Sequence, residues 1–388
     1  MEEWKLTKIG SICKRICSGG TPKSTIEEYY GGTIPWLNTK EINFNRIYNT
    51  ESTITEAGLK NSSAKWIEAK SVIIAMYGAT AAKCAIGMIP MTTNQACCNL
   101  MIDENKADFR YVYYAIANSY SQLASLANGG AQQNLNAQLI KDFEIPLPTL
   151  TTQKKVADIL FAIDDKIDIN NRINHNLEQQ AQALYKSWFV DFEPFKKTGL
   201  VYSELGYIPQ GWGVSEIKDI AVLNAGGDKP QLVSEKANKD CNIPIYSNGL
   251  DRKGLYGFTN ELRIGVPSIT ITARGTIGDV QLRLSPYCPI VRLLSITPKE
   301  PTSLLFLYYT LKNKSINGVG TTQQQLTIPN FQKEKIILPK NDVINSFYDS
   351  IYPIIKQMNY YEDENESLAS IRNLILPEIM SKGLYIKA

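Results

Sequence analysis

One stretch of this sequence occurs twice, and the duplication limits the possible folds more than any other feature. Gly129–Pro148 reads GGAQQNLNAQLIKDFEIPLP and Gly320–Pro339 reads GTTQQQLTIPNFQKEKIILP, at a constant offset of 191 residues. Upstream, the pair Gly19-Gly20 is matched by Gly226-Gly227. Two copies of one module in one chain predict two similar domains related by a pseudo-twofold axis.

The two copies share one pattern of short apolar runs separated by loops rich in Gly, Asn, Thr and Pro. Runs of this length, rich in β-branched residues, predict buried strands. We expect such strands at 71–76, 99–102, 268–272 and 290–296, and short helices at 107–118 and 304–313. Each copy is therefore expected to fold as a mixed α+β globular domain.

A long helical segment follows each copy. We expect the first helix to run from Thr151 or Thr152 to about Phe192, and the second from Asn341 or Asp342. Pro353 and Pro377 are expected to kink or restart the second. The chain thus divides into a globular domain at 1–150, a central spacer helix at 151–200, a globular domain at 201–340 and a distal spacer helix at 341–388.

Apolar residues recur along both helical segments near heptad spacing and in one register across the repeat. The expected seam consists of Ile163, Ile167, Leu177, Leu184, Ile354, Met358, Leu368 and Ile375. A shared seam on two long helices favours an antiparallel coiled coil. The alternative is two independent amphipathic helices, each packed on its own globular domain.

Composition and motifs argue against catalysis by this chain. Its seven cysteines include no CxxC pair, which disfavours a zinc site or a disulfide framework and fits a reducing cytoplasm. A single histidine, His175, and the absence of a GxxxxGK[ST] loop disfavour histidine-dependent, multi-histidine metal and ATP-motor mechanisms. The paired acids Asp164-Asp165 and Glu362-Asp363-Glu364 are expected to lie on solvated helix faces. We therefore expect a binding protein.

Charge and hydropathy give weaker indications of the partner. Residues 201–340 carry 16 Lys and Arg against 11 Asp and Glu, whereas residues 1–150 carry 14 against 13. This local positive excess is compatible with nucleic-acid binding. No apolar run approaches the roughly 18 residues that span a bilayer, and the polar N-terminus is unlike a secretory signal, so no membrane role is expected.

Several segments of both copies match a known family. In the first copy they are Gly19–Pro22, Tyr30–Trp36, Ile54–Ala64, Ala75–Thr80, Thr92–Ala96, Gln132–Leu135 and Ile145–Pro148; in the second they are Ile243–Gly249, Ala273–Thr276 and Gln323–Leu326. With these motifs, the repeat and the helices, the chain resembles the specificity subunits of type I restriction–modification systems over nearly its whole length.

The resemblance implies a non-catalytic, sequence-specific DNA-recognition subunit. It implies two target-recognition domains, at 1–150 and 201–340, each reading one half of a gapped site on double-stranded DNA. The spacer helices would set the distance between the half-sites and dock two methyltransferase subunits. Methyl transfer and ATP-dependent cleavage would belong to methyltransferase and restriction motor subunits, with S-adenosylmethionine, ATP and Mg in those partners and no cofactor in this chain.

Residue chemistry selects candidate DNA contacts in the loops that follow the expected strands. Amides suit adenine, whereas Arg and Lys suit guanine or phosphates. Candidates for base readout are Asn38, Thr39, Lys40, Tyr77, Thr80, Asn248, Arg252, Lys253, Arg274 and Thr276; candidates for phosphate contacts are Lys83, Lys229 and Arg263. Trp36 is expected in the core. Arg274 stands where the first copy has Tyr77, and Pro244-Ile245 where it has Pro35-Trp36, so the two domains should read different half-sites.

Two alternative functions remain open on sequence grounds. The chain could be a specificity chain of a fused type whose catalytic half is missing, although it carries no methyltransferase tetrapeptide. It could also be a coiled-coil scaffold with two protein-binding heads. A steep salt dependence of DNA affinity would separate DNA recognition from scaffolding.

Overall fold

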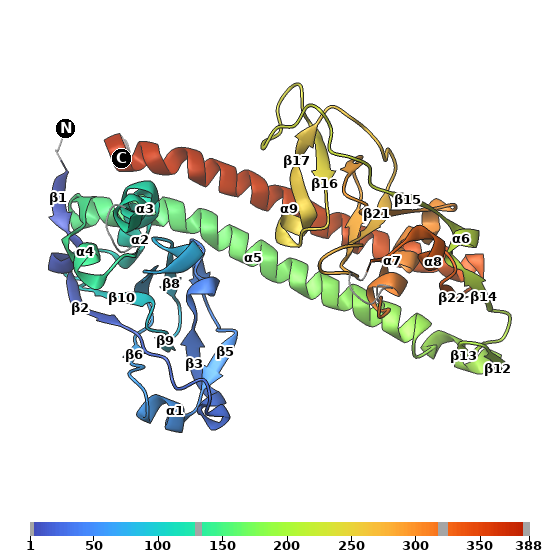
Figure 1. Ribbon diagram of the computed structural model, residues 1–388, viewed down its shortest axis with the longest axis horizontal. Coiled ribbons are helices and arrows are strands. Elements are labelled where there is room, and N and C mark those ends of the chain that lie inside the picture. The colour runs from blue at the N-terminus through green and yellow to red at the C-terminus, as the bar shows by residue number, and fades with distance from the viewer. Residues whose placement is uncertain (1–3, 129–133, 317–324, 383–388) are drawn as a thin grey trace. The chain divides into compact units, whose positions relative to one another are not determined.

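The protein divides into two compact units that share both long helices. The structure, a computed structural model, describes residues 4–128, 134–316 and 325–382. Unit 1 combines the residues up to Asn170 with those from Asp363 onward, and unit 2 runs from Asn171 to Glu362 (Figure 1). Helix α5 spans Leu150–Phe189 and helix α9 spans Asn341–Lys382. Each unit therefore contains a segment of both helices.

Unit 1 is built on two sheets and a strand pair. The first sheet has the order β2 (Cys13–Ser18), β10 (Cys97–Ile102), β7 (Ser71–Ala75), β8 (Cys84–Gly87) and β4 (Asn45–Ile47). The second has the order β5 (Ser52–Ile54), β3 (Tyr30–Leu37), β9 (Met91–Thr93) and β6 (Trp66–Ile67), and β1 (Lys5–Lys8) pairs with β11 (Glu144–Leu147). The short helices are α1 (Glu56–Lys60), α2 (Phe109–Asn118), α3 (Tyr120–Asn128) and α4 (Ala137–Asp142).

Unit 2 repeats the order of the central strands, but no strand among its described residues matches β4 or β6. Its main sheet has the order β15 (Ala221–Ala225), β21 (Leu294–Pro298), β18 (Ser268–Ile271) and β19 (Val280–Arg283), which matches β2-β10-β7-β8. Its second sheet, β17 (Leu255–Thr259), β16 (Ile243–Tyr246) and β20 (Cys288–Pro289), matches β5-β3-β9, and β14 (Gly213–Glu216) pairs with β22 (Lys335–Leu338). Its helices are α6 (Ile217–Ile220), α7 (Leu304–Lys312) and α8 (Ile328–Phe331), and the hairpin β12 (Leu200–Ser203)–β13 (Gly206–Pro209) precedes the sheets. The predicted duplication is confirmed.

The repeated Gly-Gly pair has a steric cause in both units. A Cβ atom at Gly19 would lie 2.1 Å from the carbonyl oxygen of Thr93, and one at Gly226 would lie 2.7 Å from the backbone nitrogen of Ile290. Real Cβ atoms do not approach other atoms so closely, so only glycine lets the two backbone segments touch.

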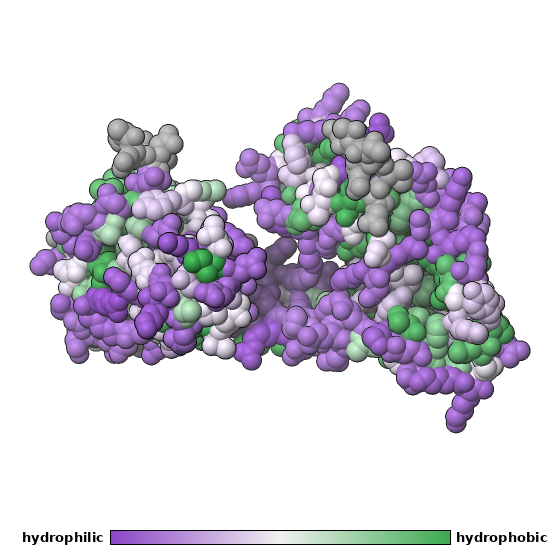
Figure 2. Space-filling model, turned by 60° about the horizontal axis from the view of Figure 1, so that its bottom comes forward, coloured by the Kyte–Doolittle hydropathy of each residue, from purple (hydrophilic) through white to green (hydrophobic). Residues whose placement is uncertain are grey.

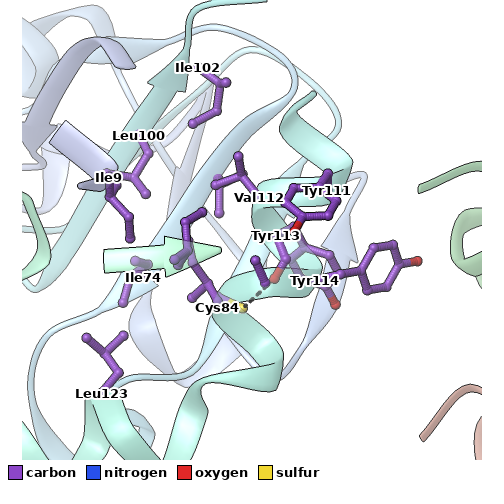
Figure 3. Close-up of a cluster of buried hydrophobic side chains, with 14 of the residues drawn as sticks. Ile9, Ile74, Cys84, Leu100, Ile102, Tyr111, Val112, Tyr113, Tyr114 and Leu123 are labelled. Carbon is purple, nitrogen blue, oxygen red and sulfur yellow. Dashed lines mark hydrogen bonds between the residues drawn. The ribbon is translucent and has the colours of Figure 1, made fainter. Parts of the chain in front are cut away.

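The core of unit 1 lies between the first sheet and helices α2 and α5. All five residues of β7 are buried, and α2 contributes Tyr111 and Tyr114. Figure 3 shows Ile74 of β7, Tyr111 and Tyr114 in the cluster that contains Cys84, whose thiol lies 3.9 Å from the carbonyl oxygen of Tyr113. Ile379 and Met380 from the end of α9 complete this core. Each buried large apolar side chain contributes about 1.5–3 kcal/mol, so residues far apart in sequence jointly stabilise the unit.

The core of unit 2 is rich in aromatic rings from both long helices. The rings of Phe189 in α5 and Phe347 in α9 pack edge to face with centroids 4.8 Å apart. Trp212 and Phe306 pack against Phe189 as well, at centroid distances of 5.9 Å and 5.0 Å. Such edge-to-face pairs add about 0.5–1.5 kcal/mol each beyond burial of area.

Within each unit, α5 and α9 run antiparallel, as expected. In unit 1, Asp164 and Asn170 of α5 contact Arg372 and Asn365 of α9, respectively. In unit 2, Asn174 donates to the carbonyl oxygen of Met358 at 3.1 Å. Residue numbers therefore rise along α5 in the direction in which they fall along α9.

The expected seam residues are only partly enclosed. Leu184, Ile354 and Met358 pack against the core of unit 2, and Ile375 packs against that of unit 1. Ile163, Ile167, Leu177 and Leu368 are half-buried. The fully buried apolar residues of the long helices, such as Leu160 and Ile351, face the globular cores. The helices therefore combine a pairing contact with the packing on their own domains that was the alternative.

Two expectations about local structure were wrong, and the restart that was one option at the prolines of the second helix is absent. Helix α9 runs through Pro353 and Pro377 without a restart. The strand expected at 290–296 begins only at Leu294, because Val291 and Arg292 form a turn with φ of 54° and 62°. Asp164 is buried with 7% of its surface exposed, whereas a solvated face was expected. It accepts hydrogen bonds from Tyr114 and Arg372, which replace water.

One face of the molecule shows how polar and apolar residues are distributed on the surface. On the face seen in Figure 2, hydrophilic residues predominate and hydrophobic ones form small, separate areas. None of the helices in the described part is both long and apolar enough to cross a membrane. Within the same part, no group of three or more His, Cys, Asp or Glu side chains is placed to hold a metal ion.

Candidate nucleic-acid interface

A tight turn with an exposed side chain follows a buried strand at the same place in both units. We call these the glycine turns; they comprise Tyr77–Thr80 after β7 and Arg274–Ile277 after β18. Gly78 and Gly275 have φ of 75° and 70°, a left-handed conformation that favours glycine. Tyr77 is 39% exposed and Arg274 is exposed, so each rigid strand carries its side chain out to solvent. Thr276 is also exposed, whereas Thr80 is half-buried.

A second turn lies beside each glycine turn, and its residues escaped the sequence-based prediction. We call these the partner turns; they are Gln95–Ala96 in unit 1 and Val291–Arg292 in unit 2. In unit 2, Val291 and Arg292 donate backbone hydrogen bonds to the carbonyl oxygens of Gly227 and Gly226, both at 2.9 Å. Gln95 and Arg292 are exposed. The sequence signal for these turns was the Gly-Gly pair, because two adjacent glycines allow another backbone segment to pack directly against them. The partner turns follow the segments that do so.

The link between the two turns differs between the units. In unit 1 the connection is direct, because the backbone N–H of Met76 donates to the carbonyl oxygen of Ala96 at 2.8 Å. In unit 2 the side chain of Asn248 lies between them. Its Nδ2 donates to the Val291 carbonyl and its Oδ1 accepts from the Ala273 N–H, both at 2.7 Å. The amide of Asn248, a predicted base reader, is thus engaged in holding two loops together.

The other predicted readers of unit 1 are engaged within the protein. Asn38 accepts a hydrogen bond from Asn94 at 3.2 Å and caps the short turn that begins at Thr39, which is half-buried. Lys40 pairs with Glu51 at 2.6 Å, although its side chain is 66% exposed. Lys83 donates to Asn43 at 2.8 Å. Asn38 lies beside the partner turn through Asn94, whereas Lys83 is linked to the segment before β4. Trp36 is buried and donates to the carbonyl oxygen of Gly20, as expected for a core residue.

The basic candidates of unit 2 differ in their freedom. Lys253 pairs with Glu362 of α9 at 2.6 Å, and Lys229 donates to the hydroxyl of Tyr256 at 2.7 Å. Arg263 contacts the carbonyl oxygens of Asp228 and Pro289 as well as the Glu261 carboxylate. Arg252 and Arg274 are exposed and form no hydrogen bond or ion pair with any residue that the structure describes. These two are the arginines among the candidates that remain available to a ligand.

The glutamine-rich loops fall largely outside the described residues. Gln132, Gln133, Gln323 and Gln324 lie outside that part of the chain. Just after each loop, the backbone N–H of Leu135 donates to the Met76 carbonyl at 3.0 Å, and that of Leu326 to the Ala273 carbonyl at 3.1 Å. Both glutamine segments therefore rejoin the described structure next to a glycine turn.

A tyrosine–carboxylate contact ties each globular domain to helix α5. Tyr114 donates to Asp164 at 2.5 Å in unit 1, and Tyr309 donates to Glu178 at 3.1 Å in unit 2. Burial raises the pKa of both phenols well above its usual range, so both remain protonated donors. These contacts attach α2 and α7, which pack on the sheets that carry the turns, to helix α5.

Comparison with known proteins gives one consistent result. The family model for the type I restriction modification DNA specificity domain matches residues 1–179 and 209–358. The MjaIX specificity subunit of a type I restriction enzyme from Methanocaldococcus jannaschii is 29% identical, over 100% of this chain and 94% of its own length. The HindI specificity subunit from Haemophilus influenzae is 24% identical, over 68% of this chain and 73% of its own length.

A solved structure shares the fold. The S subunit of a type I restriction–modification system from M. genitalium superposes with a TM-score of 0.61 at 16% sequence identity. The match covers 98% of this chain and 97% of that one. The similarity therefore extends to both domains and both long helices.

Proposed function

We propose that the glycine turns and partner turns are the DNA-reading surfaces of this chain, which belongs to the specificity subunits of type I restriction–modification systems. As a specificity subunit it recognises DNA sequence with two domains, each reading one half of a bipartite, gapped site. The long helices set the spacer between the half-sites and dock the methyltransferase subunits.

One observation carries the choice of surface. At the same topological position of both units, a fully buried strand ends in a left-handed glycine and displays a different side chain, Tyr77 in one and Arg274 in the other. Base readout needs side chains that vary on a scaffold that does not. The repeated backbone supplies the scaffold, and the variation gives the two domains different half-sites.

The partner subunits supply the chemistry in this proposal. Two methyltransferase subunits would bind S-adenosylmethionine, and restriction motor subunits would bind ATP and Mg, all in the cytoplasm. Helix α9 supports docking of a partner, because Ile371 and Leu374 lie one turn apart and are 49% and 73% exposed. Exposed apolar residues on adjacent turns are typical of surfaces that another protein covers.

Mapping of methylated bases in the host genome, with and without this gene, tests the function. We expect deletion to abolish methylation at one gapped, two-part motif and to leave other motifs unchanged. The motif would give both half-sites and the spacer length. An unchanged pattern in cells that express the chain and its methyltransferase would contradict the proposal and favour the scaffold alternative.

A further inference from the structure

We propose that Arg274 and Arg292 form a guanine-reading pair for the second half-site, with Asn248 as the residue that sets their separation. The proposal rests on the proposed function and goes further, since it assigns a base type and a reader that the sequence pattern had placed inside a strand. It concerns unit 2 alone.

Arg274 and Arg292 lie in an environment that several other cations of this domain lack. Both side chains are exposed, and neither forms a hydrogen bond or an ion pair with a residue in the described ranges. Lys253, Lys229 and Arg263 are each engaged with protein groups, as described above. Arg283 is buried and donates to Thr270 and to the carbonyl oxygen of Lys253. Arg274 and Arg292 thus keep their full donor sets for a ligand.

Asn248 fixes the distance between the two turns that carry these arginines. Its Oδ1 accepts from the backbone of Ala273, the residue before Arg274. Its Nδ2 donates to the carbonyl of Val291, the residue before Arg292. Both contacts are 2.7 Å long and use opposite ends of one planar amide, so the turns lie one amide group apart. Aspartate lacks the donor and would repel the Val291 carbonyl.

The backbone around Arg292 is held in a conformation that residues other than glycine seldom adopt. Val291 and Arg292 have φ of 54° and 62°, which is rare for a β-branched residue such as valine. Backbone hydrogen bonds to Gly226 and Gly227 hold both residues there. Strain of this kind persists only where the surroundings impose it, and it occurs preferentially at binding sites. The turn therefore holds the backbone at Arg292, from which the side chain leaves, in one defined conformation.

Guanine is the base that suits such a pair. An arginine guanidinium donates two parallel hydrogen bonds to O6 and N7 of guanine in the major groove. Two guanidinium groups held at a fixed separation would read two guanines within one half-site. Unit 1 offers Tyr77 and Gln95 at these turns, and the exposed amide of Gln95 suits adenine. The arginine pair is thus specific to the second half-site.

The pair is tested by incubating a randomised duplex library with the full complex of this chain and its methyltransferase partner, and by determining which sequences become methylated. We expect Arg292→Asn and Arg274→Gln each to relax one guanine position of the second half-site by about 5- to 150-fold, while the first half-site stays unchanged. Asparagine is chosen at 292 because it tolerates a left-handed backbone. Arg292→Lys should also lose guanine selectivity, because it keeps the charge but not the two-pronged donor. Asn248→Asp should relax both positions.

Lys299→Ala is the control. Lys299 is exposed and follows β21 at the end opposite to Arg292, where it donates to the carbonyl oxygen of Asp219 at 3.0 Å. Its loss should leave the base preference at both guanine positions unchanged. An even weakening by Arg292→Asn, with base preference and melting temperature unchanged, would make Arg292 a phosphate contact and overturn the pair. An absence of sequence-selective methylation by the unaltered complex would contradict the proposed function itself.

Discussion

Asp164 and Asp165 are neighbours of the same type in opposite environments. The side chain of Asp164 is 10% exposed and meets Arg372 at 2.6 Å, whereas that of Asp165 is 55% exposed. Arg46, with only 3% of its side chain exposed, lies within 4.0 Å of Asp164 and packs its guanidinium 3.5 Å from the ring centre of Phe161. A buried carboxylate between two guanidinium groups links β4, α5 and α9 within unit 1.

Substitution of Asp164 should be far more damaging than its position on a long helix would indicate. Asp164→Ala removes the carboxylate that pairs with Arg372 and accepts from Tyr114, whereas Arg46 keeps Asp165 and Asp168. Breaking a buried ion pair costs about 3–5 kcal/mol. Denaturant unfolding of the purified chain measures this loss. Asp158→Ala is the control, because Asp158 is 64% exposed and pairs with Arg110, a contact worth at most about 1 kcal/mol. Equal losses in the two variants would show that Asp164 has no special role.

The sequence could not distinguish these two aspartates. Burial of Asp164 depends on Arg372, which lies 208 residues away. Arg292 was missed for a similar reason, since the run 290–296 has the composition of a strand and the hydrogen bonds that turn it come from Gly226 and Gly227. Trp36 was correctly placed in the core, because a large aromatic residue in an apolar run is buried in most contexts.

The long helices differ in how they pair at equivalent positions. With the offset of 191, the ion pair Asp164–Arg372 of unit 1 corresponds to Ile355 and Ala181, both buried in the core of unit 2. If each helix paired with the segment equivalent to its true partner, Asp164 would face Ala181, or Arg372 would face Ile355. Either arrangement would bury a charge without a counter-charge, which disfavours it. Because one unit has a charged pair where the other has an apolar pair, the correct pairing of helix segments is favoured over the exchanged one.

Lengthening both helices should lengthen the spacer of the DNA site. Seven residues inserted after Asn170 in α5 and after Glu362 in α9 add about 10 Å, or about 3 base pairs, while nearly preserving the facing surfaces. Methylation mapping should show both half-sites unchanged and the spacer longer. The control inserts seven residues into α5 alone; it shifts one helix against the other and should abolish methylation. An unchanged spacer in the double insertion would contradict the ruler role.

Elements were more predictable than contacts, for physical reasons. Helix α9 begins at Asn341, one of the two expected starts, and α2 and α7 lie within the expected ranges. The prolines were misjudged because Pro353 and Pro377 are exposed, where water can satisfy the carbonyl groups left without an N–H donor. Turns were the weakest part, since they depend on backbone contacts that no local pattern encodes.

At the scale of the whole molecule, the order of the chain does not follow the division into units. Unit 1 gathers strands β1 to β11, the first part of α5 and the last part of α9. Ile379 and Met380, from the last described turn, are 4% and 3% exposed in its core. Stability of the first globular domain therefore depends on residues that follow the second globular domain in the chain.

A cavity at the end of α9 should loosen unit 1 and spare unit 2. Ile379→Ala removes buried methyl groups, at a cost of about 2–5 kcal/mol. Hydrogen exchange should accelerate in β7 and β10 and stay unchanged in β18 and β21. Ile371→Ala, on the same helix but 49% exposed, is the control and should change neither set. Acceleration in β18 instead would contradict the assignment of this helix end to unit 1.

The placement of Ile379 and Met380 also has a genetic consequence. A stop codon or a frameshift between the codons of Met358 and Ile379 would leave the second domain with all of its core residues and would remove Ile379 and Met380 from the core of the first. Selection on the codons of Ile379 and Met380 is thus selection on the function of a domain whose other residues are encoded far upstream.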